Sequence, residues 1–260
     1  MTDLSYHEQR DKLDIRIRAH KLFANIDIDD FIDEFLSRAP RRAILDIGCG
    51  NGHHLGMYLR HVGPTGRVMG IDREAGLVET ARASYADAPN VEVIVGSMDD
   101  PLPAGDESFD LAFSNFAIYN ARDPRATLLE ARRVLKPGGE VVLIGPTRRN
   151  AYEIYEYNAR LTGTAIDPIT LVRTDRLRQE ILPIAQTVFG SIREEIVNSF
   201  LTFPTPDEFL AYFKATMLYE EGAEKLGVTD DDMRRALPAE RDIVLSKEML
   251  VLIGKREDDR

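Results

Sequence analysis

The residues best suited to chemistry lie in one short stretch, Ile44-Leu-Asp-Ile-Gly-Cys-Gly-Asn-Gly-His53. Its glycines, Gly48, Gly50 and Gly52, occupy every second position, and glycine is required where the backbone turns tightly beside a closely approaching ligand. The apolar residues before the glycines favour a strand, and a helical pattern follows them. The first N–H groups of such a helix, together with its positive dipole end, attract polar ligands. The stretch therefore resembles a nucleotide-binding turn between a strand and a helix.

Histidine at position 53 separates this turn from the dinucleotide fingerprint G-x-G-x-x-G, which needs a third glycine there. An NAD-dependent oxidoreductase of Rossmann type thus becomes the alternative function. A neutral imidazole suits a general base at pH 7, and His54 is our candidate for it, with packing or solvent exposure as the other interpretation. We expect no metal site, because His53 and His54 are adjacent and no His/Asp/Glu set accompanies them.

Short apolar strands alternate with helical patterns along the central part of the chain, which predicts βαβ units and a parallel sheet. Lys136-Pro-Gly-Gly139 predicts the end of a helix and a turn. The expected strands are 43–47, 67–71, 91–95, 111–113 and 140–144, and the expected helices between them are 53–61, 74–86 and 124–135.

The flanking segments have a different character. Apolar spacing predicts one or two helices over 13–35, broken near 25–27. After position 146 we expect helices at 150–161 and 175–189, others starting near Thr205 and Thr229, and strands within 192–203 and at 249–254, followed by a solvated tail over 255–260. We accordingly divide the chain into an N-terminal helical lid (1–38), a cofactor-binding core (39–146), and cap helices with the closing strands of the same sheet (147–260).

Four ordered motifs in the core are similar to those of class I S-adenosylmethionine-dependent methyltransferases. They are Leu45-Asp-Ile-Gly-Cys-Gly-Asn-Gly52, Gly70-Ile-Asp72, Gly96-Ser-Met-Asp99 with 106–110 after it, and the stretch 128–146. The resemblance covers about residues 40–146 and includes the strand at 249–254. It implies an α/β, Rossmann-like, doubly wound and mostly parallel seven-stranded sheet, with a helical N-terminal segment and C-terminal cap insertions.

The same resemblance implies S-adenosylmethionine as cofactor and a set of residues that hold it. Asp72 would bind both ribose hydroxyls, which is sound chemistry for a carboxylate. Many members have Gly-Asp at the adenine position, whereas Gly96 is followed here by Ser97, so either Asp99 or the backbone of Met98 would contact adenine. The cofactor set is Asp46, Gly48, Cys49, Gly50, Gly52, Asp72, Arg73, Ser97, Met98, Asp99 and Asn115.

Three residues are candidates for catalysis. Tyr119 follows the fourth strand and should lie at the mouth of the site, where Asn115 is also placed. His54 opens the first core helix. Tyr6 belongs to a segment that covers the cofactor in similar small-molecule enzymes, although a frayed terminus explains it equally well.

Composition bounds the partners. The chain of 260 residues carries 33 basic and 44 acidic residues, a net charge of −11, which disfavours nucleic acid as a partner. The apolar runs are far shorter than the about 20 residues that span a bilayer, so no membrane association is expected. The single cysteine, Cys49, fits the cytoplasm. We expect methyl transfer to nitrogen or oxygen of a small-molecule acceptor of specialised metabolism such as antibiotic biosynthesis, leaning towards an amine. A homo-oligomer is possible, and a non-catalytic cofactor-binding regulator is the second alternative.

Overall fold

Seven strands form one sheet in the order β3-β2-β1-β4-β5-β7-β6 in the computed structural model, which describes residues 10–166, 171–172, 174–237 and 242–257. Strands β1 to β5 are parallel, and β7 runs antiparallel to both of its neighbours. The predicted α/β fold class is confirmed. The strands are β1 (Ala43–Ile47), β2 (Arg67–Asp72), β3 (Val91–Val95), β4 (Phe109–Asn115), β5 (Leu135–Pro146), β6 (Ile192–Phe203) and β7 (Ile243–Lys255).

Helices cover both faces of the sheet, because alternate strand residues point to opposite sides. Leu45 and Ile47 of β1 pack in the core beneath α5 (Pro124–Val134) and α8 (Leu182–Phe189). Ile44, between them, belongs to the opposite core. That second core lies beneath α2 (Ile28–Ser37), α3 (Leu55–Val62) and α4 (Ala75–Ser84).

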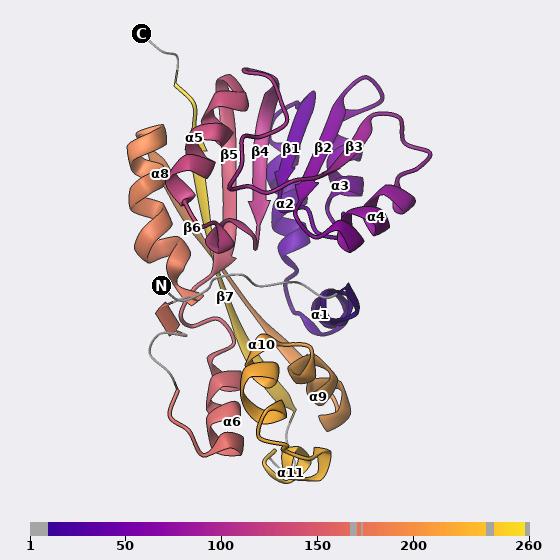
Figure 1. The fold of residues 1–260 in the computed structure, drawn as a ribbon, viewed down its shortest axis with the longest axis vertical. Coiled ribbons are helices and arrows are strands. Elements are labelled where there is room, and N and C mark those ends of the chain that lie inside the picture. Colours follow the sequence, from indigo (N-terminus) through magenta and orange to yellow (C-terminus); the bar gives the residue numbers. More distant parts are fainter. Residues whose placement is uncertain (1–9, 167–170, 173, 238–241, 258–260) are drawn as a thin grey trace.

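Strands β6 and β7 are longer than predicted and carry the cap beyond the sheet. Pairing of β5 with β7 ends at Pro146 and Met249, whereas β6 and β7 stay paired to Phe203 and Ile243. This two-stranded extension holds four helices around an aromatic core (Figure 1). We call these helices the cap: α6 (Tyr152–Thr162), α9 (Pro206–Lys214), α10 (Met217–Tyr219) and α11 (Asp230–Arg235).

Helix α1 (Arg10–Phe23) lies at the junction of the sheet and the cap (Figure 1). The Arg16 guanidinium donates a hydrogen bond to the carbonyl of Ala215 at 3.3 Å, and Ala24 forms a β-bridge with Leu201. The helical region breaks near 25–27 as predicted, where Asp27 caps α2 by accepting from the N–H of Asp29. The N-terminal helix is therefore tied to the cap and the core together.

Three short helical turns lie between these elements. They are η1 (Ile118–Asn120), a 3₁₀ turn after β4, and the π-helical turns η2 (Leu177–Ile181) and η3 (Glu220–Glu224).

The Lys136–Gly139 turn ends α5 at Val134, close to the predicted end of the helix. The turn then lies inside β5 instead of before it. Phe109 pairs with Leu135 and Leu111 with Glu140, so residues 136–139 bulge out between two paired positions. The strand therefore starts earlier than predicted.

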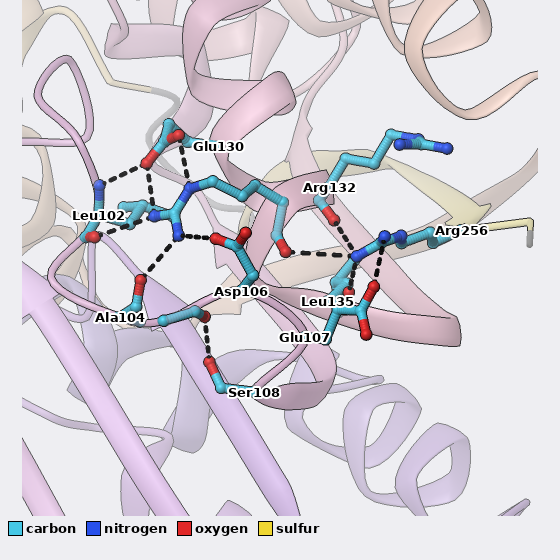
Figure 2. A network of polar contacts seen from close by, with 11 residues as sticks. Leu102, Ala104, Asp106, Glu107, Ser108, Glu130, Arg132, Leu135 and Arg256 are labelled. Carbon is cyan, nitrogen blue, oxygen red and sulfur yellow. Dashed lines mark hydrogen bonds and ion pairs between the residues drawn. The ribbon is translucent and has the colours of Figure 1, made fainter. Parts of the chain in front are cut away.

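The segment after β7 is not a solvated tail at Arg256, which is 7% exposed. Its guanidinium donates to the carbonyls of Arg132, Arg133 and Leu135 at the end of α5, and to Glu107 at 2.9 Å (Figure 2). Helix ends leave such carbonyls without intrahelical partners, and a cation there is favourable. Arg256 thus fixes the end of the last strand to the core.

Candidate functional site

A cavity of about 500 Å³ opens at the carboxyl ends of the parallel strands, the edge where ligands bind in such sheets. Its walls come from three parts of the chain: the turn after β1 with the ends of β2 and β4, the helices α1 and α2, and the cap with β7. The cavity therefore lies between the sheet and the segments that surround it.

The glycine turn packs so closely against its neighbours that side chains would not fit at two of its positions. Gly48 has φ of +84°, and a Cβ atom there would lie 2.2 Å from Cβ of Ala117. Gly52 has φ of +81° but does not line the cavity. A Cβ atom there would lie 2.9 Å from Cβ of Ala81, so this glycine lets the turn pack against α4. Cys49 and Gly50 line the wall beside Gly48.

Asp72 ends β2 and faces the cavity, followed by Arg73, which also lines it. The carboxylate of Asp72 accepts hydrogen bonds from the backbone N–H of Gly50 at 2.8 Å and from that of Glu74 at 2.9 Å. Burial raises the pKa of Asp72 above its usual value. A carboxylate has about four acceptor positions, so these two bonds leave capacity for ligand hydroxyls.

Two polar atoms are orphaned near the glycine turn. Asp46 is 1% exposed and lies behind the wall instead of lining it, and its Oδ1 has no hydrogen-bond partner among the described residues. Burial and the charge of Asp72 raise the pKa of Asp46 to about 8. Asn115 lines the cavity, donates to the hydroxyl of Tyr58 at 2.6 Å, and likewise leaves its Oδ1 unpartnered in the described structure.

Ser97, Met98 and Asp99 line the cavity after β3. The carboxylate of Asp99 accepts from the backbone N–H of Arg122 at 2.7 Å and from its Nε at 3.1 Å. Both oxygens of Asp99 therefore already hold the neighbouring loop.

A histidine pair shares one carboxylate on the cavity wall. Nε2 of His53 lies 2.9 Å from Oδ2 of Asp29, and Nε2 of His54 lies 3.1 Å from Oδ1. Burial lowers the pKa of His54. Burial alone would raise the pKa of Asp29, but hydrogen bonds from both histidines outweigh it and hold that pKa well below its usual range. His54 is thus a neutral imidazole whose orientation is fixed by the ionised carboxylate of Asp29.

The expectation that no carboxylate accompanies these histidines is wrong. Asp29 belongs to α2. One of its carboxylate oxygens and one ring nitrogen of each histidine, atoms of the kinds that bind metal ions, lie within 4.8 Å of one another. The sequence shows Asp29 only as an acid in the first turn of a helix, which is ordinary there.

Tyr119 lines the cavity in η1, where a Cβ atom on Gly145 would lie 3.0 Å from its ring. Tyr6 lies outside the described residues. Two non-glycine residues on the wall, Phe116 and Ala151, have φ of +53° and +52°, and such backbone strain clusters at functional sites.

We expected an N-terminal lid and a C-terminal cap beside the site, but most of the residues with which α1, the cap and β7 line the cavity were not predicted. Apolar or aromatic spacing predicted those helices but not which residues face inward. The residues concerned include Leu13, Arg16, Ile17, His20, Asn150, Tyr155, Tyr212, Met217, Lys247 and Met249.

Comparison with known sequences places a methyltransferase domain family at residues 45–143. Over 111 residues the chain is 42% identical to an uncharacterized 37.1 kDa protein in a transposon of Streptomyces fradiae and 35% identical to an arsenite methyltransferase of Halobacterium salinarum. It is 36% identical to a demethylmenaquinone methyltransferase of Staphylococcus aureus over 117 residues. These matches cover 42–43% of this chain and between 28% and 48% of the relatives, less than half of each.

Solved structures share the fold at low identity. The YcgJ protein of Bacillus subtilis superposes with a TM-score of 0.62 at 17% identity, covering 89% of this chain and 98% of that one. A putative methyltransferase of Bacillus halodurans gives 0.60 at 17% identity, covering 88% and 99%. The [4+2]-cyclase SpnF gives 0.56 at 18% identity, covering 89% and 80%.

Within the described ranges, the helices are too short or too polar for any of them to cross a bilayer.

Proposed function

We propose that this chain, whose residues 45–143 match a methyltransferase domain family, is an S-adenosylmethionine-dependent enzyme that methylates a nitrogen or oxygen atom of a small-molecule acceptor. The observation that carries the proposal is one cavity whose wall joins the glycine turn and Asp72 to the cap. A cofactor at the sheet end and an acceptor at the cap end would then meet inside it.

The residues at the sheet end fit S-adenosylmethionine, which when bound supplies an electrophilic methyl group. Gly48 lets the turn pack against Ala117 on the cavity wall, and Asp72 would accept the two ribose hydroxyls. Ser97 and Met98 would border the adenine, while the orphaned oxygen of Asn115 offers an acceptor to the cofactor's ammonium. The neutral acid Asp46 behind the wall would hold the turn in place.

The chain's main contribution to catalysis would be alignment of the acceptor and exclusion of water. Proximity and orientation can supply about 7–11 kcal/mol. The enclosing segments, α1 from one side and the cap from the other, provide walls for both tasks.

His54 would act as the general base for an acceptor that must lose a proton. With its Nε2–H donated to Asp29, the lone pair of the imidazole lies on Nδ1, 3.5 Å from the Asn115 amide. The lowered pKa keeps that nitrogen unprotonated at pH 7. Asp29 would position the ring and stabilise the imidazolium that forms. Tyr119 would contact the acceptor at the mouth of the site.

A small-molecule acceptor is supported by the size of the cavity and by two of the relatives, an arsenite methyltransferase and a demethylmenaquinone methyltransferase. The acidic composition speaks against nucleic acid. A cytoplasmic enzyme of specialised metabolism is part of the same proposal, supported by the single cysteine.

The test is formation of S-adenosylhomocysteine by the purified chain across a panel of small amines, alcohols, phenols and acids, followed by mass spectrometry of the acceptor. We expect turnover with a subset of the panel and none with tRNA or protein. Methylation of tRNA or protein alone would contradict the acceptor class. Cofactor binding without turnover on any acceptor would favour a non-catalytic regulator.

A further inference from the structure

A lysine faces the cap end of the cavity from an otherwise apolar strand face. Every second residue of β7 points to the same side, and on one side these are Leu245, Lys247 and Met249, all of which are buried. Lys247 is 7% exposed and lines the cavity, as does Met249. Strand neighbours two positions apart are separated by about 7 Å. Lys247 therefore lies two residues further than Met249 along the β6–β7 extension, towards the cap.

Lys247 has no hydrogen bond or ion pair with any residue that the structure describes. The two carboxylates of the helical wall already have partners: Asp27 caps α2, and Asp29 binds the histidine pair. The next residue, Glu248, accepts from the Thr147 hydroxyl at 2.7 Å. A buried ammonium without a counter-charge is costly, so an uncompensated lysine on a cavity wall suggests a ligand that compensates it.

Helix α1 adds positive charge on the same side. Arg16 and His20 line the cavity one helical turn apart. Burial, followed by the charges of Lys247 and Arg16, lowers the pKa of His20 to about 3. His20 is thus a neutral imidazole able to donate one hydrogen bond. Lys247 and Arg16, which also donates to the carbonyl of Ala215, supply the positive charge of this subsite inside an acidic protein.

We propose that the acceptor carries an anionic group, a carboxylate or a phosphate, which Lys247 binds with support from Arg16 and His20. The inference rests on the proposed function, since it concerns the acceptor of that same cavity. Ile17, Ile154 and Met249 form apolar wall, so the acceptor would have an apolar body with one anionic end.

The experiment uses the full chain saturated with S-adenosylhomocysteine, titrated in a calorimeter with inorganic phosphate or acetate at constant ionic strength set by sodium chloride. We expect at least one of the two anions to bind, and the comparison of the two identifies phosphate or carboxylate as the preferred group. Lys247→Met should weaken that binding by about tenfold or more, because a charge-assisted contact is lost. Lys247→Arg should retain it.

Lys255→Met is the matched control, because this exposed lysine lies on the same strand outside the cavity, and it should bind the anion like the wild type. Absence of binding for both anions, or full binding by Lys247→Met, overturns the inference. The affinity for S-adenosylhomocysteine is measured first with every variant. If the wild type does not bind S-adenosylhomocysteine, the proposed function is wrong. If it binds S-adenosylhomocysteine but neither anion, only this inference is wrong.

Discussion

At the residue scale, Asp29 orients His54, the candidate general base on the cavity wall, and also contacts His53. The three residues come from α2 and from the turn before α3, and their contacts are side chain to side chain. Adjacent histidines in a sequence do not indicate which one receives a carboxylate, because the partner depends on how two helices pack. The candidate base could be predicted from its type and position, and its orienting partner could not.

His54→Ala should lower kcat/KM by about a hundredfold for an acceptor that must lose a proton, since general-base catalysis contributes at least that much. In the wild type, activity should persist as the pH falls to 6.5 and decline only below it, because the pKa of His54 is lowered and its protonated form is inactive. The pH–rate profiles of wild type and variant check this.

Asp29→Asn tests the positioning role, because the carboxylate raises the pKa of His54 and its removal should shift the acid limb to still lower pH while kcat falls. His61→Ala is the control: that histidine pairs with Asp33 at 2.9 Å and does not line the cavity. Equal loss of activity in His61→Ala and His54→Ala would contradict the assignment.

The raised pKa of Asp46 predicts how the unfolding free energy depends on pH. Its pKa in the folded chain is raised to about 8, so the folded state must keep a proton that the unfolded state releases above about pH 4. The free energy of keeping this proton in the folded state rises with pH and destabilises the wild type. Asp46→Asn removes that contribution, because asparagine does not titrate. The unfolding free energy of the variant, relative to wild type, should therefore increase by roughly 2–4 kcal/mol between pH 5 and pH 8. Urea denaturation at the two pH values measures it, with the exposed Asp87→Asn as control. A difference independent of pH would contradict the raised pKa.

At the element scale, the parallel strands of the core were the most predictable part. Strand β1 coincides with its expected range, 43–47, because a strand buried on both faces reads as a continuous apolar run. The extension of β7 to Ile243 could not be predicted, because three consecutive polar residues, 246–248, interrupt the apolar pattern and only pairing with β6 makes the strand continuous.

Arg256 shows how one side chain can fix an element, and it supplies a test. Arg256→Ala should lower the unfolding free energy by about 2 kcal/mol, because the carbonyls at the end of α5 lose a charged donor in a buried place. Thermal unfolding checks this against Lys255→Ala, the exposed preceding residue, which should change little. Equal melting temperatures for the two variants would show that the contacts in Figure 2 carry little stability.

At the scale of the whole molecule, the sheet supplies one end of the cavity and the added segments supply the other. The ordered motifs of the core predicted the sheet end, since glycine spacing and strand-end acids are local features. The cap end depends on how α1, β7 and the cap helices come together, and Lys247 belongs to it. Net charge is a sum over the whole chain, so it could not reveal a basic subsite in the interior.

Every role proposed for the cavity depends on S-adenosylmethionine binding between the glycine turn and Asp72. Calorimetric titration of S-adenosylhomocysteine into wild type, Asp72→Ala and the exposed control Asp87→Ala, with NAD titrated in parallel, tests it most directly. We expect wild type and control to bind S-adenosylhomocysteine and not NAD, and Asp72→Ala to lose about 1–3 kcal/mol of binding free energy through the missing charge-assisted hydrogen bonds. Undiminished affinity in Asp72→Ala, or binding of NAD in place of S-adenosylhomocysteine, would contradict the claim.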